Sequence, residues 1–286
     1  MRNFKSFSLS LRGKAVDISQ PWVMGIINLT PDSFFPGSRC FDQDSLRRRA
    51  AQIVADGARI IDIGAYSSRP NAFDVSEREE MDRLAKGLEI IKKEHPDIFV
   101  SVDTFRSSVA QSCVHHFGVD IINDISGGTL DDNMYATVAR LSVPYVLMHM
   151  RGNPATMQSL TAYGDITADI ISDLEAKVAK LKDKGATDII IDPGFGFSKT
   201  LGQNYELMGH LADFHKFNLP ILVGLSRKSM IYNLLESSPQ EALNGSTVLN
   251  TIAIMAGVHM LRVHDVRQAV EAITICKAIS YPYTSI

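Results

Sequence analysis

Short apolar runs alternate with longer amphipathic segments along most of the chain. The runs are rich in β-branched residues, and such continuous apolar stretches are typical of parallel strands that are buried on both faces, with helices packed outside them. The eight runs are VMGIINL (23–29), RIIDIG (59–64), IFVSVDT (98–104), VDIINDIS (119–126), PYVLMHM (144–150), DIIIDPG (188–194), PILVGLS (220–226) and MLRVHDV (260–266). Eight alternating strand and helix units predict an α/β fold, a (β/α)8 TIM barrel, with a doubly wound open sheet as the main alternative.

The segments between the runs carry helix start and stop signals. Ser76, followed by Glu79 three residues later, predicts a capping box, and Ser238 with Pro239 predicts a second helix start. Glycines stand where helices should end before the next strand, at Gly57, Gly118 and Gly185.

The first residues alternate apolar and polar side chains, because Phe7, Leu9 and Leu11 are separated by serines. With a turn at Gly13 and Lys14, this pattern predicts a β-hairpin with one buried face, lying across one end of the main fold. We expect one domain over residues 1–286, with the hairpin in residues 1–20 and eight β/α units in residues 21–286. A chain of 286 residues suits one barrel, which typically takes about 250.

Charge and cysteine content argue against several classes of partner. A net charge of −3 gives no reason to expect nucleic acid or an acidic membrane surface, so any anion must be bound by a local basic cluster. Three cysteines without CxxC pairing argue against a disulfide framework or a zinc site and favour the cytoplasm. The sequence has neither a signal peptide nor an apolar run of roughly 18 residues, so we expect no membrane span.

Polar residues lie at or after the end of nearly every apolar run. Side chains at the carboxyl ends of barrel strands and on the following loops meet at one face, where TIM-barrel active sites lie. The residues at these positions are Asn28, Asp62, Asp103, Asn123, His149, Asp192, Ser226, Lys228, Arg262 and His264. Taken singly, Asp62 and His149 are best interpreted as structural, whereas the set as a whole predicts a functional site.

Four potential cations are expected at this face. Arg262 and His264 lie two apart on one strand and point the same way, while Lys228 and Arg69 follow other strands. In a chain of negative net charge, such a cluster indicates an anionic substrate. The loops after the seventh and eighth strands are also common phosphate sites in such barrels.

The stretch DIIIDPGFGFSK (188–199) has two interpretations. Gly194 and Gly196 match the start of a dinucleotide-binding loop, but Lys199 stands where that motif needs its third glycine. The alternative is a strand that ends at Asp192, followed by a glycine turn.

Taken together, the motifs resemble the dihydropteroate synthase family over nearly the whole chain. The matching stretches are VMGIINLTPDSF, IDIG with SSRP, VSVDT, IIND with SG, LMHMRGNPATMQ, IIDPGFGF, LVGLSRKSMI and RVHDV. The resemblance implies a transferase of folate biosynthesis that joins 6-hydroxymethyl-7,8-dihydropterin diphosphate to p-aminobenzoate through SN1-like loss of diphosphate. It also implies a sulfonamide target and a homodimer.

The resemblance implies roles for individual residues. Lys228, Arg262 and Asp103 would be catalytic, and the pterin would be bound by Asp103, Asn123, Ile125, Met148, Asp192, Gly224, Lys228 and Arg262. The diphosphate would be held by Asn28, Arg69, Arg262 and His264. The p-aminobenzoate pocket would comprise Ser68, Arg69, Pro70, Phe197, Lys228 and Ser229. Asn28 would also be the one protein ligand of a Mg²⁺ ion that phosphate oxygens and water otherwise hold.

The chain departs from the family pattern in its first two loops and after the sixth strand. Pro36 replaces an acidic residue in the first loop, and a glutamate, a threonine and a glycine of the second are replaced by Tyr66, Ser68 and Asn71. Ser198 replaces a glycine. None of these positions is a predicted pterin or diphosphate residue, so we expect activity with altered loop behaviour.

Two other functions remain open. One is a non-catalytic pterin-binding homologue, which the altered loops keep open, although the presence of Asp192, Lys228, Arg262 and His264 in one chain argues against it. The other is a methyltetrahydrofolate-dependent corrinoid methyltransferase, which would not need SSRP, SRKS and RVHD.

Overall fold

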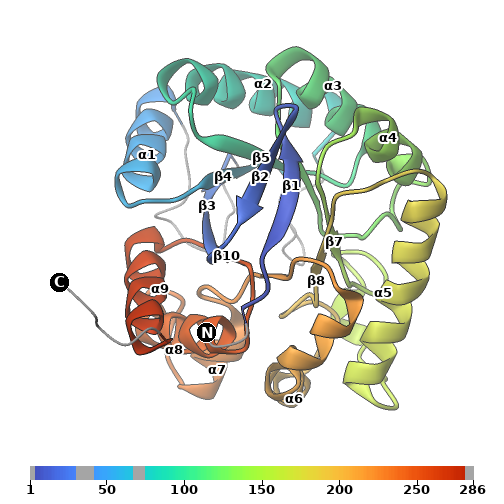
Figure 1. Cartoon of the computed structure of the whole chain (residues 1–286), viewed down its shortest axis with the longest axis vertical. Helices are drawn as coiled ribbons and strands as arrows, with labels where there is room; N and C mark the ends of the chain where they lie inside the picture. Colours follow the sequence, from blue (N-terminus) through green and yellow to red (C-terminus); the bar gives the residue numbers. More distant parts are fainter. Residues whose placement is uncertain (1–3, 30–41, 67–74, 281–286) are drawn as a thin grey trace.

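The computed structural model describes residues 4–29, 42–66 and 75–280, and its centre is a closed barrel of eight parallel strands (Figure 1). The strands are β3 (Trp22–Asn28), β4 (Ile60–Gly64), β5 (Phe99–Asp103), β6 (Ile121–Asp124), β7 (Tyr145–Met148), β8 (Ile189–Asp192), β9 (Leu222–Val223) and β10 (Met260–Val263). β10 pairs with β3, and a parallel bridge from Ile191 to Ile221 joins β8 to the β9 segment. The predicted barrel is therefore confirmed, and the open sheet is wrong.

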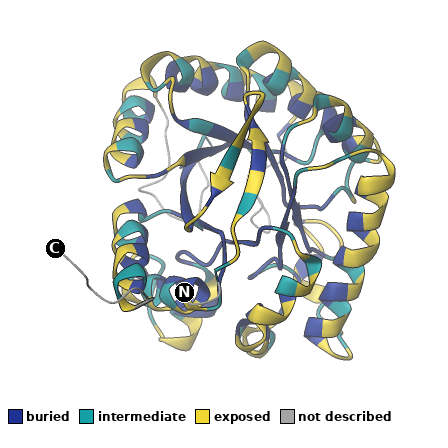
Figure 2. Cartoon of the chain, viewed as in Figure 1, coloured by how far each residue is buried: buried dark blue, intermediate teal, exposed yellow. Residues whose placement is uncertain are grey.

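Helices surround the barrel and pack their apolar faces against its outward-facing residues, while their opposite faces are exposed (Figure 2). They are α1 (Gln43–Ala55), α2 (Glu77–Glu94), α3 (Ser107–Phe117), α4 (Met134–Leu141), α5 (Ile166–Asp183), α6 (Leu201–Gly209), α7 (Ser229–Leu234), α8 (Leu243–Met255) and α9 (Val266–Ser280), with 3-10 segments at Met157–Ser159 and Leu211–Phe217. The predicted glycine stops are confirmed, since Gly57, Gly118 and Gly185 have φ of 93°, 59° and 94°. Within the described part of the chain, no helix is long and apolar enough to cross a membrane.

The predicted N-terminal hairpin consists of β1 (Phe7–Leu11) and β2 (Lys14–Ile18) and lies across one end of the barrel (Figure 1). The register places its turn at Arg12 and Gly13, one residue earlier than predicted. Both turn residues have positive φ, as expected of a two-residue type I′ turn. The buried face of the hairpin comprises Leu9, Leu11 and Ile18.

Inward-facing side chains form two layers within the barrel. The layer at the hairpin end is apolar and contains Trp22, Met24, Ile60, Ile121, Val146, Ile190, Leu222 and Met260. Side chains two apart on a strand share a face, so the next inward positions lie closer to the carboxyl ends. On four strands these positions hold Asp62, Asn123, Asp192 and Arg262. The fold therefore places a polar layer directly above an apolar floor.

The predicted capping box of α2 is only half formed. Ser76 Oγ accepts a hydrogen bond from the Glu79 amide at 3.2 Å, as expected of an N-cap. The Glu79 carboxylate instead pairs with Arg83, one turn further along the helix.

The predicted helix start at Ser238 and Pro239 is wrong. Ser238 binds the Glu241 carboxylate within a turn, and α8 begins only at Leu243. The carbonyl of Pro239 accepts a hydrogen bond from Arg227 at 2.7 Å, and this engagement holds the chain in a turn before the helix.

Candidate active site

The carboxyl ends of the barrel strands carry most of the predicted site residues. Asn28, Asp103 and Asp192 are the last residues of β3, β5 and β8. Others lie within the last three residues of a strand, namely Asp62, Asn123 and Arg262. The loops after β9 and β10 add Ser226, Lys228 and His264. Residues from both ends of the chain thus meet at one face.

Arg262 is the centre of the polar layer. Its Nε donates to Asp62 Oδ2 at 2.6 Å, and its Nη2 donates to Asp103 Oδ2 at 2.7 Å. Asn123 Nδ2 donates to the same Asp62 oxygen at 3.2 Å. The network holds the Arg262 guanidinium against β4 and β5, and Asn123 joins β6 to the same Asp62 carboxylate.

Burial and crowding of like charges shift the pKa values in this network. Burial raises the pKa of Asp103 to about 7. The Arg262 guanidinium lowers this pKa, whereas the nearby Asp62 carboxylate raises it further. Burial alone would lower the pKa of Arg262, but Asp62 and Asp103 outweigh it and raise that pKa. The guanidinium therefore stays charged, while Asp103 is poised between its two protonation states near neutral pH.

Asp62 has a larger part in the site than the sequence alone predicted. It is fully buried, and its Oδ1 has no hydrogen-bond partner among the described residues. A buried acceptor without a partner is unfavourable, so Asp62 is buried here at a cost in free energy that its ion pair with Arg262 offsets.

Asp192 ends β8 in the turn that the second interpretation of DIIIDPGFGFSK predicted. Its Oδ1 accepts a hydrogen bond from the Gly194 amide at 2.7 Å. Gly194 has φ of 74°, and a Cβ there would lie 2.0 Å from the His149 carbonyl oxygen, so only glycine fits. Burial raises the pKa of Asp192, while Lys228 and the Gly194 amide favour its ionised form.

Lys228 extends from the loop after β9 toward the turn after β8. Its Nζ donates to the Phe195 carbonyl and lies 4.6 Å from the centre of the Phe197 ring. Burial lowers the pKa of Lys228 to about 8, and Asp192 opposes this shift. The ammonium form therefore predominates at pH 7.

His264 does not contribute the positive charge expected of it. Its backbone amide and its Nδ1 each lie 3.1 Å from Ser226 Oγ. Burial, together with Arg262 and Arg49, lowers the pKa of His264 to about 3. The imidazole is neutral at pH 7, so it can donate a hydrogen bond to an anion but adds no charge.

An apolar cluster lies among the loops after β6, β7 and β8. It contains Ile125, Met148, Met150 and Met157, with Leu130 and Phe197 packed against it. Gly224 is buried after β9, where a Cβ would lie 3.7 Å from Lys228 Nζ. Ser229, by contrast, is exposed at the start of α7.

Lys199 is a buried lysine whose surroundings the sequence did not predict. Its Nζ lies 3.2 Å from His149 Nδ1 and donates to the carbonyls of Gly194 and Phe197 at 2.8 and 3.0 Å. Its Nζ thus has three protein acceptors, while burial lowers the pKa of Lys199 well below its ordinary value. His149 is confirmed as a packed histidine, since it is 1% exposed and burial lowers its pKa to about 2.

Two of the positions at which the chain departs from the family pattern, Ser198 and Tyr66, lie among the described residues. Ser198 has φ of 53°, and its hydroxyl exchanges 2.9 Å hydrogen bonds with the Arg151 backbone, which hold it in a conformation suited to glycine. The Tyr66 ring packs edge-on against Phe105 at 5.0 Å. The predicted positions outside the described residues are Pro36, Ser68, Arg69, Pro70 and Asn71.

Comparison with known proteins distinguishes among barrel enzymes. The family described as pterin binding enzyme matches residues 24–264. The dihydropteroate synthase of Escherichia coli K12 is 41% identical over 272 residues, which cover 94% of this chain and 95% of the relative. The chain belongs to the dihydropteroate synthase family.

Solved structures of dihydropteroate synthases agree with this assignment over nearly the whole chain. The Yersinia pestis protein, solved as a sulfonamide drug complex, has a TM-score of 0.91 and 40% identity, covering 96% of this chain and 99% of that one. The Thermus thermophilus protein, solved with 4-aminobenzoate, has a TM-score of 0.85 and 37% identity. The match covers 96% of this chain and 100% of that one. The TIM-barrel fold and the transferase class are therefore confirmed.

Proposed function

We propose that the protein condenses 6-hydroxymethyl-7,8-dihydropterin diphosphate with p-aminobenzoate, giving 7,8-dihydropteroate and diphosphate. The observation that carries this proposal is the polar layer at one barrel mouth, where Asp192, Lys228 and the Arg262 network lie together. Membership of the dihydropteroate synthase family supports the same reaction.

The pterin is assigned to the polar layer and the neighbouring apolar cluster. Asp192 accepts hydrogen bonds from the amino and ring N–H groups, because an ionised carboxylate offers two acceptor oxygens side by side. Asp103 and Asn123 bind further polar groups, and the planar Arg262 guanidinium stacks on the ring. Ile125, Met148 and Gly224 complete this pocket.

The diphosphate is assigned to Arg262 and His264, with Arg69 from outside the described residues. No group of three or more His, Cys, Asp or Glu side chains among the described residues could hold a metal ion. Asn28, half-buried at the end of β3, offers one amide oxygen. This sparse donor set fits Mg²⁺, which is often bound by few protein ligands together with phosphate oxygens and water. When bound, the ion neutralises charge on the leaving group.

The reaction separates charge, and the residues are placed to stabilise both ends. The C–O bond to diphosphate breaks, and its electron pair stays with the leaving oxygen beside Arg262 and the neutral His264 donor. The positive charge on the methylene is delocalised into the pterin, which Asp192 binds. The neutral aromatic amine then attacks the methylene carbon and releases its proton to solvent, so no strong general base is needed.

The p-aminobenzoate is assigned to the side of the mouth formed by Phe197, Lys228 and Ser229. The contact between Lys228 Nζ and the Phe197 ring, at 4.6 Å, gives this pocket one apolar wall and one cationic edge. Ser68, Arg69 and Pro70 are assigned to the same pocket from the second loop. We expect sulfonamides to compete at this position.

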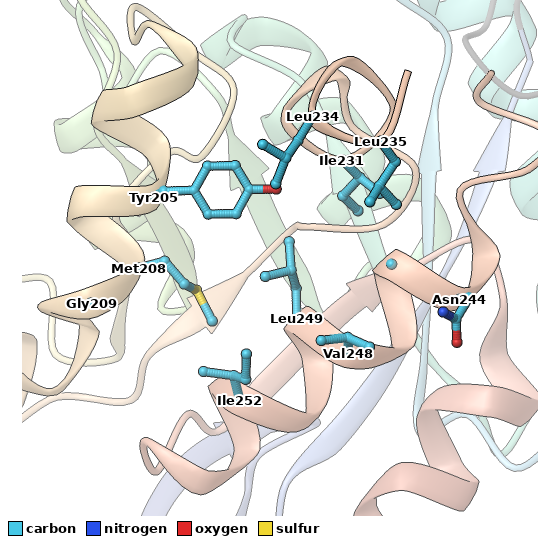
Figure 3. A pocket seen from close by; sticks show the side chains of 11 residues that line it. Tyr205, Met208, Gly209, Ile231, Leu234, Leu235, Asn244, Val248, Leu249 and Ile252 are labelled. Carbon is cyan, nitrogen blue, oxygen red and sulfur yellow. The ribbon is translucent and has the colours of Figure 1, made fainter. Parts of the chain in front are cut away.

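A homodimer is proposed through an apolar surface on α6, α7 and α8. These helices enclose a groove of about 440 Å³ lined by side chains such as Met208, Leu234 and Val248 (Figure 3). Leu234 is 53% and Val248 49% exposed, and such a patch is typical of a protein interface. Val248→Glu should shift the sedimentation coefficient to that of a monomer, whereas Leu160→Glu, at a 39% exposed leucine elsewhere, should not.

A cytoplasmic location is proposed from the cysteines. Cys113 is a free, buried cysteine. Free thiols suit a reducing compartment.

An assay of diphosphate release tests the proposed reaction. The purified protein, supplied with pterin diphosphate, p-aminobenzoate and Mg²⁺, should form dihydropteroate and diphosphate in equal amounts. Intact pterin binding without any product would contradict the proposal and favour a non-catalytic homologue.

A further inference from the structure

Arg227 and Asp265 form an ion pair between the loop after β9, which carries Lys228, and the loop after β10, the strand that carries Arg262. Arg227 precedes Lys228 after β9, and Asp265 follows His264 after β10. Arg227 Nε donates to Asp265 Oδ2 at 2.8 Å, and Nη2 donates to Oδ1 at 2.9 Å. The Arg227 side chain is only 6% exposed. This bidentate geometry fixes both the distance and the relative orientation of the two loops.

Further contacts hold both the side chain and the backbone amide of Arg227. Its Nη1 donates to the carbonyls of Pro239 and Gln240 at 2.7 Å each, and its amide donates to Ser246 Oγ at 2.9 Å. Arg227 has φ of 55°, in the left-handed region that residues with a Cβ rarely adopt. The loop therefore reaches Lys228 along one defined course that these contacts maintain.

A second contact lies beside the ion pair. Ser226 Oγ accepts a hydrogen bond from the His264 amide at 3.1 Å and lies 3.1 Å from its Nδ1. Two adjacent residues of one loop, Ser226 and Arg227, thus bind two adjacent residues of the other.

The two cations need such a constraint because they repel each other. Arg262 disfavours the charged form of Lys228 in a buried environment. Arg262 is held in place by the carboxylates of Asp62 and Asp103. The ion pair nearest to the Lys228 backbone is the one that the adjacent Arg227 forms with Asp265.

We propose that Arg227 and Asp265 are positioning residues that set the separation of Lys228 and Arg262, and thereby the affinity of the site for a pterin. The Arg227 guanidinium donates its hydrogen bonds to acceptors of the protein, so Arg227 acts on Lys228 through the backbone that joins them. The inference rests on the proposed function, in which both cations contact the pterin.

Arg12 and Asp120 provide a matched control at the opposite end of the barrel. Arg12 Nε and Nη2 donate to the two Asp120 oxygens at 2.8 and 3.2 Å, and the Asp120 side chain is 1% exposed. Arg12→Lys and Arg227→Lys both keep the charge but lose the parallel pair of hydrogen bonds. The two variants should therefore cause comparable structural damage at different distances from the site.

The test measures the dissociation constant for 6-hydroxymethylpterin and the thermal midpoint of each full-length variant. Arg227→Lys should weaken pterin binding by about tenfold to 100-fold, since small misplacements of binding groups have effects of that size. Arg12→Lys should lower the thermal midpoint but leave pterin affinity within about twofold of wild type. An Arg227→Lys protein that binds pterin as well as Arg12→Lys would overturn the inference.

A milder variant guards against misfolding of Arg227→Lys. Ser226→Ala removes only the second contact and should weaken pterin binding by about threefold, as expected for one net hydrogen bond. Unchanged affinity in this variant would also count against the inference. Turnover by the wild type tests the proposed reaction separately, because the pterin affinities can be compared even if no product forms.

Discussion

The two ends of the barrel are made from the same strands but differ in chemistry. Ile60 and Met260 are fully buried in the apolar layer below the hairpin. Two residues further along the same strands, Asp62 and Arg262 form an ion pair at the mouth. Since two residues are one repeat of a strand, the change from packing to chemistry requires no change in backbone geometry.

The buried carboxylates at the two ends also differ in their hydrogen-bond partners. At the hairpin end, the Asp120 carboxylate accepts hydrogen bonds from Arg12, Lys92 and the Val100 amide. At the mouth, Asp62 Oδ1 has no partner among the described residues, and burial raises the pKa of Asp103. The Asp120 carboxylate at the hairpin end is therefore satisfied by the protein alone, whereas the mouth retains a carboxylate oxygen without a partner among the described residues.

Among substitutions at the mouth, replacement of Lys228 should have the largest effect on kcat/KM. Lys228→Ala should lower kcat/KM by about 100-fold to 1,000-fold, as expected when a preorganised donor is removed from an active site. Steady-state diphosphate release would measure this loss. Lys216→Ala, at an exposed surface lysine, is the control and should keep the wild-type rate. An unchanged rate in Lys228→Ala would remove this residue from the site.

Replacing Leu11 should affect the hairpin end alone. Leu11 is 1% exposed within the apolar layer, so Leu11→Ala should lower the free energy of unfolding by about 2–5 kcal/mol. Ser8→Ala, on the exposed face of the same hairpin, should change stability by less than about 0.5 kcal/mol. Urea denaturation and kcat/KM would be measured together. A parallel loss of kcat/KM in folded Leu11→Ala would contradict the independence of the two ends.

The pH dependence of the reaction should report the charge of Lys228. Because burial lowers its pKa to about 8, the cation is present below that pH and is lost above it. We expect kcat/KM to fall by about tenfold per pH unit on the alkaline side. Lys228→Arg keeps its charge, so its lower rate should lack this decline. The same decline in Lys228→Arg would assign the titration to another group.

Replacing Asn28 should have a smaller and more selective effect. Asn28→Ala should weaken Mg²⁺-dependent diphosphate binding by about tenfold, comparable to the loss of one charge-assisted contact. Binding of a pterin without diphosphate should be unchanged. Calorimetric titrations with and without Mg²⁺ would separate the two, and equal losses would count against the assigned role.

The sequence predicted those features that depend on local pattern. Apolar runs, glycine stops and hairpin alternation are read within a few residues, so the barrel followed from them. The polar face followed as well, because strand direction alone brings Asp103 and Asp192 to the same mouth.

Features that depend on distant contacts were not predicted. The ion pair between Asp62 and Arg262 was not predicted, because the two residues lie 200 positions apart. His264 was counted as a cation because its burial beside Arg262 and Arg49 is visible only in the fold. The hairpin turn was displaced by one residue, since cross-strand register decides between Arg12 and Lys14.

Pterin binding by Asp192→Asn tests the central claim most directly, namely that the polar end of the barrel is the functional end. Calorimetry with 6-hydroxymethylpterin would compare this variant with wild type and with Leu11→Ala. We predict that Asp192→Asn binds about tenfold to 100-fold more weakly, because one charged hydrogen-bond acceptor is lost, while Leu11→Ala binds as wild type does. Wild-type affinity in a folded Asp192→Asn protein would contradict the claim.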